Sequence, residues 1–355
     1  MKNIIKTVIV MLTSISLFTS ANAGELTVSG TAKATYNITS GYANTGKALG
    51  VANEFDLGAN GELDNGYTWK YQIQMDPGNS TNVSSSSEVE NDDSQLTLTT
   101  PYGTVGVFIS EGGLDLEDGA SQSVYGRPTD LGDPSATTDA YDIDGTNNLQ
   151  YHTPKDLLPF GIAVKVGYAP NAPDANNSAN GSGVVNTRAT TNKGLTAHGM
   201  QVKAEPIDGL VVGASFVETM DSATELTRRG DNNSYAAMIT YAIGSFELGA
   251  SRSHFDPFIN SVATPTTTAK YYEQGNYSVA FAVNDNLSLS YELEESEKTF
   301  LADAQATVEQ TSTALQAAYT MGGMTVALSL GDYENVGYTT SNDAKQTLIA
   351  VSMAF

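Results

Sequence analysis

The segment LTVSGTAKATYNI, residues 26–38, alternates apolar or small residues with polar ones along its whole length. Successive side chains of a β-strand point to opposite faces. A hydrophobic period of two residues therefore predicts a strand with one apolar face and one polar, solvated face. The same alternation returns along the chain, for example in YTWKYQIQM at residues 67–75 and in TLIAVSMAF at residues 347–355. Helical periodicity is nearly absent, and the sequence therefore predicts an all-β protein.

About sixteen segments of this kind follow one another, with polar or turn-forming residues between them. They lie near residues 25–38, 51–60, 67–76, 93–100, 104–109, 147–153, 160–168, 194–204, 210–217, 233–242, 245–254, 271–283, 287–294, 308–319, 324–330 and 345–355. Proline cannot donate a hydrogen bond to a β-ladder and is excluded from strand interiors. All 11 prolines fall between the segments, as expected if the segments are strands.

The connections between these segments alternate in length. Tight ones, such as residues 61–66, 101–103 and 243–244, contain Gly, Asn, Asp or Pro, whereas those between them are long and polar. Turns of that composition join antiparallel neighbours. Turns at one end and long loops at the other predict an antiparallel up-and-down sheet closed into a transmembrane β-barrel. A soluble sandwich or adhesin is the alternative, but the polar face is heavy in Thr, Gln, Asn, Glu and Lys, which suits a water-filled lumen.

Residues 1–23 are typical of a secretory signal peptide. Lys2 and Lys6 stand at the start of an apolar stretch that ends near Phe18, and Ala21-Asn22-Ala23 matches a cleavage site. The mature chain, residues 24–355, is then one barrel domain outside the cytoplasm. The absence of Cys excludes a disulfide scaffold and cysteine metal sites. A net charge of -23 argues against nucleic acid as a partner, because phosphates attract clustered Lys and Arg.

Three short motifs in the sequence, together with the strand pattern, resemble those of a known protein family. They are TTPYGTV at residues 99–105, NLQYHTP at residues 148–154 followed by Phe160-Gly161, and the C-terminal Phe355. The mature chain resembles the Gram-negative general diffusion porins, a family of trimeric sixteen-stranded barrels of the outer membrane. The resemblance implies a homotrimer among outer-membrane lipid and lipopolysaccharide. It also implies a C-terminal strand, ending in Phe355, that the barrel-assembly machinery recognises.

The longest connection, residues 110–146, is the third long loop. The resemblance implies that this loop folds into the lumen and forms the constriction of the pore. Its candidate constriction residues are acidic apart from one arginine: Glu111, Asp115, Glu117, Asp118, Arg127, Asp130 and Asp133. A merely solvated acidic surface run is the alternative.

Candidate residues of the lumen wall share the polar-face parity of their strands. They are Lys33, Glu54, Asp56, Lys70, Lys165 and Lys203. The resemblance implies a basic wall opposite the acidic loop, but these strands offer single lysines where the family is usually arginine-rich. In a simple register of the 61–66 hairpin, Asp56 lies opposite Lys70 and neutralises it. Because a narrow passage focuses the potential of its acidic residues, we expect a cation-preferring channel.

The expected function is passive diffusion of small hydrophilic solutes and ions through a water-filled channel. A substrate-selective channel for cationic or neutral nutrients is a second hypothesis, and a structural or adhesive surface barrel is a third. The sequence carries no catalytic motif, so we expect no enzyme activity. We expect no resident cofactor or metal. Divalent cations shared with lipopolysaccharide are a candidate at acidic loop runs such as residues 88–93 and 294–297.

Overall fold

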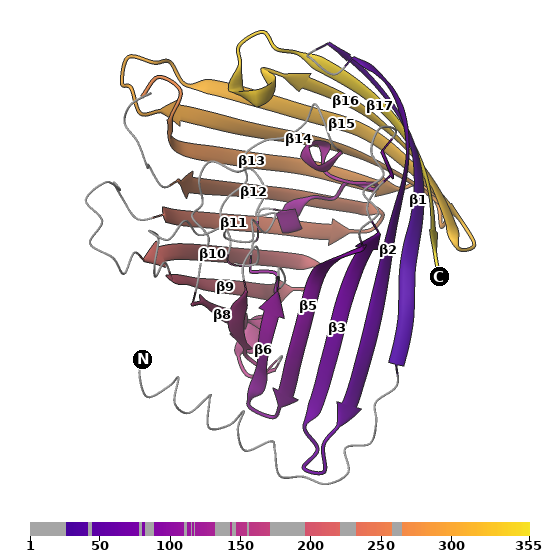
Figure 1. Ribbon diagram of the computed structural model, residues 1–355, viewed down its shortest axis with the longest axis vertical. Coiled ribbons are helices and arrows are strands. Elements are labelled where there is room, and N and C mark those ends of the chain that lie inside the picture. Colours follow the sequence, from indigo (N-terminus) through magenta and orange to yellow (C-terminus); the bar gives the residue numbers. More distant parts are fainter. Residues whose placement is uncertain are drawn as a thin grey trace.

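The computed structural model describes residues 26–41, 45–77, 80–81, 89–109, 112–114, 116, 118–131, 143, 147–154, 156–170, 196–220, 232–257 and 265–355. These residues form one sheet of 17 strands, which curves round on itself (Figure 1). All strands except the two-residue β4, which pairs with β2, follow one another antiparallel round a closed ring. The predicted antiparallel barrel of sixteen strands is thereby confirmed.

The strands and short helices of the barrel have the following bounds. The strands are β1 (Leu26–Gly41), β2 (Gly46–Glu62), β3 (Thr68–Pro77), β4 (Ser80–Thr81), β5 (Val89–Thr100), β6 (Gly103–Ile109), β7 (Asn148–His152), β8 (Ala163–Ala169), β9 (Thr196–Ile207), β10 (Leu210–Met220), β11 (Asn232–Ile243), β12 (Phe246–Asp256), β13 (Ala269–Ala282), β14 (Leu287–Phe300), β15 (Val308–Met321), β16 (Met324–Glu334) and β17 (Ala344–Ala354). The 3-10 helices are η2 (Asp118–Ala120), η3 (Pro128–Asp130), η4 (Pro159–Gly161) and η5 (Val336–Tyr338). Within the described ranges, the chain has no helix that is long and apolar enough to cross a membrane.

The ring closes where the first strand meets the last. β1 and β17 pair antiparallel, from Gly41 opposite Ala344 to Thr31 opposite Ala354, and Figure 1 shows the two strands side by side at this seam. Gly30 and Phe355 extend the ladder by one more pair, since the amide N–H of each donates to the carbonyl oxygen of the other at 3.0 Å. Closure pairs the backbone groups that an edge strand would leave open, which a barrel in lipid requires.

The two faces of the strands carry opposite kinds of side chain. Exposed large apolar residues recur at every second position, for example Leu289 and Tyr291 on β14. Buried polar residues such as Ser290 and Glu292 occupy the positions between them. A soluble β-sandwich buries its apolar face, whereas this barrel presents that face outward and its polar face inward. This is the arrangement of a barrel whose outer wall contacts lipid.

Several strands run further than their apolar pattern. β14 continues to Phe300, so Glu294, Glu295 and Glu297 lie on a strand and not in a long loop as predicted. In the same way β5 begins at Val89, which places residues 90–93 of the other acidic run on a strand. Both faces of a strand are polar beyond the apolar band. The alternation that marks a strand in the sequence therefore ends before the ladder does.

Two prolines lie on strands, contrary to the prediction that all would fall between them. Pro77 is the last residue of β3, and Pro206 is the next-to-last residue of β9. The register between β9 and β10 shifts between Leu210 and Val212. Proline is tolerated at strand ends and at bulges, because no ladder hydrogen bond is required from its nitrogen there.

The seam depends on the absence of a side chain at residue 30. A Cβ there would lie 2.3 Å from the carbonyl oxygen of Glu54 and 2.8 Å from the Phe355 ring. We expect Gly30→Ala to push these strands apart and to lower the free energy of unfolding by about 1–3 kcal/mol, the usual cost of overpacking. Heat-modifiability of the refolded protein on denaturing gels would report this as a lower unfolding temperature.

Gly46→Ala is the matched control for this prediction. Gly46 also lies on a seam-side strand, β2, but a Cβ at that residue meets nothing within 4 Å. Equal unfolding temperatures for the two variants would contradict the close packing of the seam.

Candidate functional site

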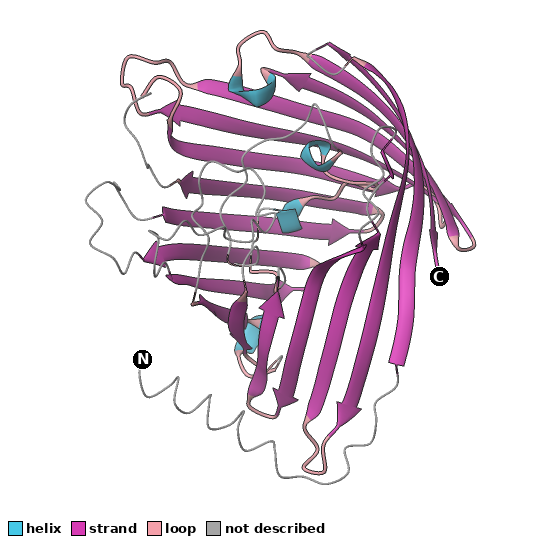
Figure 2. Ribbon diagram, viewed as in Figure 1, coloured by secondary structure: helices cyan, strands magenta, loops and turns pink. Residues whose placement is uncertain are grey.

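The described residues of the 110–146 segment cross the polar face of the barrel from strand to strand. At one end, the carbonyl oxygens of Gly112 and Gly113 accept hydrogen bonds from Lys165 Nζ on β8, at 3.0 and 2.8 Å. At the other end, Leu131 O accepts a hydrogen bond of 3.1 Å from Gln346 Nε2 on β17. Its helices η2 and η3 are the cyan turns seen against the middle strands in Figure 2. The described residues from Gly112 to Leu131 therefore follow the arc of the wall from β8 to β17, whereas Ile143 packs beside Leu114 against β8, β9 and β10.

Glycines on the polar face make room for the apolar side chains of this segment. Gly167, Gly199 and Gly213 stand on β8, β9 and β10, and a Cβ on any of them would come within 3.1 Å of a leucine. The leucines are Leu114 and Leu116, which are both 0% exposed. Burying a leucine side chain stabilises a structure by about 1.5–3 kcal/mol. Leu114 and Leu116 thus pack into the space that the missing side chains of these glycines leave, and this packing attaches the start of the segment to the barrel wall.

The backbone of the segment passes close to β12 and β13 at Ala120. A Cβ on Gly249 of β12 would lie only 1.7 Å from the carbonyl oxygen of Ala120. Ser278 Oγ on β13 donates to that oxygen at 2.9 Å and accepts a hydrogen bond from the amide of Gln122 at 3.0 Å. Wall side chains thus satisfy backbone groups that have no partner within the segment's own secondary structure.

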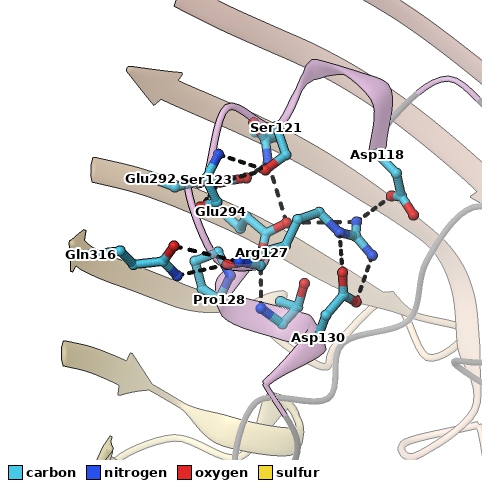
Figure 3. A network of polar contacts seen from close by, with 12 residues as sticks. Asp118, Ser121, Ser123, Arg127, Pro128, Asp130, Glu292, Glu294 and Gln316 are labelled. Carbon is cyan, nitrogen blue, oxygen red and sulfur yellow. Dashed lines mark hydrogen bonds and ion pairs between the residues drawn. The ribbon is translucent and has the colours of Figure 1, made fainter. Parts of the chain in front are cut away.

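Glu292 on β14 is the acceptor at the centre of a first polar cluster (Figure 3). Its Oε2 accepts hydrogen bonds from Ser121 Oγ, at 2.6 Å, and from Ser123 Oγ. Its Oε1 accepts a hydrogen bond from Asn276 Nδ2 on β13. Charged acceptors make hydrogen bonds roughly twice as strong as neutral ones, so this buried carboxylate is a firm attachment point for the segment.

Arg127 is the centre of a second cluster (Figure 3). Its guanidinium donates to both carboxylate oxygens of Asp130, at 2.8 Å each, and to Asp118. Its Nη1 also lies 3.7 Å from Glu294 Oε1 on β14. The side chain of Arg127 is 10% exposed, whereas those of Asp118 and Asp130 are 42% and 52% exposed. One buried cation thus faces three carboxylates, and the part of the cluster that faces water is acidic.

Gln316 on β15 binds the backbone between the two clusters. Its Oε1 accepts a hydrogen bond from the amide of Tyr125 at 3.0 Å, and its Nε2 donates to Gly126 O at 2.7 Å. Farther along, the buried hydroxyl of Tyr333 on β16 donates to Pro128 O at 3.1 Å. Because buried polar groups are costly without partners, these pairs hold the segment and the wall together.

Two of the predicted wall lysines contact the segment itself. Lys165 binds the carbonyl oxygens at its start, as described above. Lys33 Nζ on β1 lies 5.4 Å from the centre of the Tyr125 ring, which is a cation–π distance. Both ammonium groups are therefore engaged by the segment rather than standing across open water from it.

The predicted pairing of Asp56 with Lys70 is wrong. Asp56 lies opposite Gln74, and Lys70 lies opposite Asn60. The turn is centred two residues later than a simple hairpin at 61–66 would have it, because its closing hydrogen bond runs from the amide of residue 63 to the carbonyl oxygen of residue 67. Asp56 Oδ1 instead accepts a hydrogen bond of 3.2 Å from Gln72 Nε2.

The remaining predicted residues have separate places in the molecule. Glu54 lies opposite Thr31 of β1, and Lys203 lies opposite Gly213 of β10. Phe355 lies at the seam, where its ring is 5.6 Å from that of Phe55, edge to face. The predicted constriction residues Glu111, Asp115, Glu117 and Asp133 lie outside the described residues.

The residues of the wall that bind the segment could not be predicted from the sequence. The main ones are Ser278, Glu292, Glu294 and Gln316, from three adjacent strands. Their parity was readable, since they alternate with outward residues such as Leu293. Alternation along a strand tells on which face of the sheet a side chain lies, but it does not tell which residue the side chain contacts. The contacts here join residues that are more than 150 positions apart in the chain.

The architecture is shared with solved porin structures of low sequence identity. OmpF of Salmonella typhi, solved in complex with daunomycin, is 14% identical and superposes with a TM-score of 0.69 over 94% of this chain and 98% of that chain. The anion-selective porin of Comamonas acidovorans is 12% identical, with a TM-score of 0.66 over 94% and 100%. The trimer form of OmpT from Vibrio cholerae is 14% identical, with a TM-score of 0.65 over 94% and 100%. At such identities the likeness shows the fold alone.

Sequence comparison gives the family. No curated protein sequence matches the chain significantly. The family model of the Gram-negative porins matches residues 8–355, which is nearly the whole chain. The closed barrel with an apolar outer face and a polar inner face agrees with that match. The chain therefore belongs to the Gram-negative porin family, the channels of the outer membrane.

Proposed function

We propose that this porin conducts small hydrophilic solutes and ions by passive diffusion and that it prefers cations. In this proposal, residues 110–146 lie in the lumen and narrow it, leaving the water path between the segment and strands β2 to β6. The contacts of residues 112–131 with the polar face from β8 to β17 support this placement. A sixteen-stranded barrel without such a constriction encloses a wide aqueous channel.

The exposure of the Arg127 cluster is the observation that carries the cation preference. The guanidinium is directed into the cluster and is nearly buried, while Asp118 and Asp130 keep about half of their side-chain surface open to water. Carboxylates beside a narrow water path, with low-dielectric walls around them, raise the local concentration of cations. The net charge of the whole chain, -23, has the same sign.

Shared architecture does not decide the selectivity of this channel. One of the similar structures is described as an anion-selective porin. Selectivity must therefore come from the side chains that line the water path, and in this chain those of the described cluster are acidic.

We also propose how the protein is exported and assembled. A signal peptide at residues 1–23 would direct export, and the barrel-assembly machinery would recognise the C-terminal strand that ends in Phe355. Three copies would assemble in the outer membrane among lipid and lipopolysaccharide, as one similar structure, OmpT of Vibrio cholerae in its trimer form, suggests by analogy.

Reversal potentials under a KCl gradient test the cation preference. For the protein refolded into a planar bilayer, we expect a reversal potential of the sign that cation permeation gives. We expect the double variant Asp118→Asn, Asp130→Asn to lower the cation-to-anion permeability ratio by about two- to fivefold, since exposed charges typically contribute about 0.2–1 kcal/mol. The outward-facing double variant Glu295→Gln, Glu297→Gln removes the same charge and should leave the ratio unchanged.

An anion-favouring reversal potential of the native protein would refute the proposed selectivity. A stable barrel that shows no conductance at all would refute the channel itself. An equal fall of the permeability ratio in both double variants would mean that total charge, rather than the Arg127 cluster, sets the selectivity.

Gln316 tests whether the segment narrows the channel. Gln316→Leu removes both hydrogen bonds to the backbone at Tyr125 and Gly126, and each polar group left buried without a partner costs about 1–3 kcal/mol. We expect the segment to loosen and single-channel conductance to rise, with additional conductance levels. Thr313→Val is the control, since Thr313 lies on the outward face of the same strand and its hydroxyl donates to Asp332 O at 3.3 Å. Unchanged conductance in Gln316→Leu would contradict a constriction formed by this segment.

A further inference from the structure

Lys298 is an inward-facing lysine near the end of β14 that leads into a long connection. It stands four residues beyond Glu294 on the same side of the strand, which places it about 13 Å farther toward that end of the barrel. The outward apolar residues of β14, such as Leu289 and Tyr291, lie nearer the other end of the strand. Lys298 therefore lies beyond the apolar band, at the end of the lumen that is here called the mouth.

Three aromatic rings surround the ammonium group of Lys298. Its Nζ lies 5.9 Å from the centre of the Tyr272 ring on β13, 5.1 Å from that of Phe300 on β14 and 5.8 Å from that of Tyr338 in η5. A cation within about 6 Å of a ring centre is attracted by the face of the ring. These three residues are called the aromatic cage below.

Neighbouring groups hold the aromatic cage in place. Tyr272 is 3% exposed, and its ring is 6.2 Å from the Phe255 ring and 5.4 Å from the Tyr338 ring. The hydroxyl groups of Tyr338 and Ser296 share a hydrogen bond of 2.7 Å. These contacts draw η5, the yellow turn at the top of Figure 1, onto the polar face of β13 and β14.

The backbone of η5 is strained at the residue that completes the cage. Tyr338 adopts a φ of 57°, a left-handed conformation that residues other than glycine rarely adopt. Such strain persists only where the surroundings hold a residue in place, and it is often found where a protein clamps a ligand. The position of the Tyr338 ring is therefore a feature that needs an explanation beyond the path of the chain.

The ammonium group of Lys298 has donors that the cage does not satisfy. It carries three N–H groups, and ring faces offer no oxygen acceptor. Among the residues that the structure describes, Lys298 makes no hydrogen bond and no ion pair, and it contacts only the three rings through its charge. Burial lowers the pKa of Lys298 below its usual value, because a partly buried cation without a counter-charge is unfavourable. A bound anion would offset this cost.

We propose that Lys298 and the aromatic cage bind a small organic carboxylate at the mouth of the channel. The carboxylate would accept hydrogen bonds from the ammonium group, and hydrogen bonds between charged groups are about twice as strong as neutral ones. The apolar part of the ligand would lie beside Tyr338, which is partly exposed. Because Lys298 faces the lumen, the ligand is a solute and not a phosphate group of the surrounding lipopolysaccharide.

This site goes beyond the proposed passive diffusion of cations. The wall of β14 changes charge along its length, from carboxylates at Glu292 and Glu294 to an ammonium group at Lys298. The acidic surface of the Arg127 cluster disfavours anions deeper in the lumen, whereas Lys298 would hold one at the mouth. Binding is measured without any conduction, so this proposal and the proposed function can fail separately.

Nuclear magnetic resonance of the protein labelled at the ε-carbon of lysine tests the proposal. The full chain is refolded in detergent without lipopolysaccharide, and the signal of Lys298, displaced by the three rings, is identified by its loss in Lys298→Met. We expect benzoate to shift this signal saturably. The control signal is that of Lys70, an exposed inward lysine beside the tight β2–β3 turn, which Lys70→Met identifies. We expect no saturable shift of the Lys70 signal.

Two further probes separate the charge of benzoate from its ring. Benzamide has the ring without the charge, and acetate has the charge without the ring. We expect each to bind about fivefold more weakly than benzoate, because each loses one of the two kinds of contact. Equal binding of benzamide would contradict the role of Lys298, and equal binding of acetate would contradict the role of the cage.

The unfolding temperature of Lys298→Met gives a second test. The variant removes a partly buried cation and keeps a long apolar side chain, whose sulfur can contact the rings. Without an organic anion, we expect it to unfold at the same temperature as the native protein or higher. Benzoate should raise the unfolding temperature of the native protein and of Lys70→Met but not that of Lys298→Met, because only a bound ligand stabilises the folded state.

A Lys298 signal that moves no more than that of Lys70 would overturn the proposal. An equal stabilisation of the native protein and Lys298→Met by benzoate would overturn it as well. Conductance of the same preparation shows separately whether the channel function stands.

Discussion

The closed backbone ladder is the constraint on which the rest of this structure depends. In lipid, an amide or carbonyl group without a partner costs several kcal/mol, so the sheet has to pair its own first and last strands. The pairs from Gly41–Ala344 to Gly30–Phe355 do this. Once the ring is closed with its apolar face outward, every second side chain points into a polar interior. Whatever fills that interior must be held by polar contacts more than by a hydrophobic core.

The described part of the 110–146 segment illustrates how a chain segment is held against the polar face of the barrel. Two leucine side chains of the segment pack on glycines of the wall, and wall side chains form hydrogen bonds with backbone groups of the segment. The wall supplies carboxylates at Glu292 and Glu294, and the segment supplies hydroxyls, amides and Arg127. Around Arg127, loop and wall therefore meet with charges reversed from the simple expectation of an acidic loop facing a basic wall, although Lys33 and Lys165 of the wall also contact the segment.

The sequence was sufficient for the architecture because period-two alternation is a local signal that lipid exposure makes strong. All sixteen ring strands were predictable from it, and so was the face on which each side chain lies. The alternation failed where strands leave the apolar band, as at Glu297 on β14, and it could not give the register of the β2–β3 hairpin. Register depends on the turn, and one hydrogen bond between residues 63 and 67 moved Asp56 away from Lys70.

Charge counting alone does not give the arrangement of the candidate site, for a related reason. The composition of the segment gives many acids and one arginine, but selectivity depends on which of these groups remain open to water after pairing. Arg127 is buried by its contacts with Asp118, Asp130 and Glu294, and each aspartate gives up only part of its surface to the same contacts. The guanidinium thus links the carboxylates from a buried position, while the Asp118 and Asp130 carboxylates remain partly exposed to water. The buried Arg127 therefore makes the local field less negative without adding a positive surface.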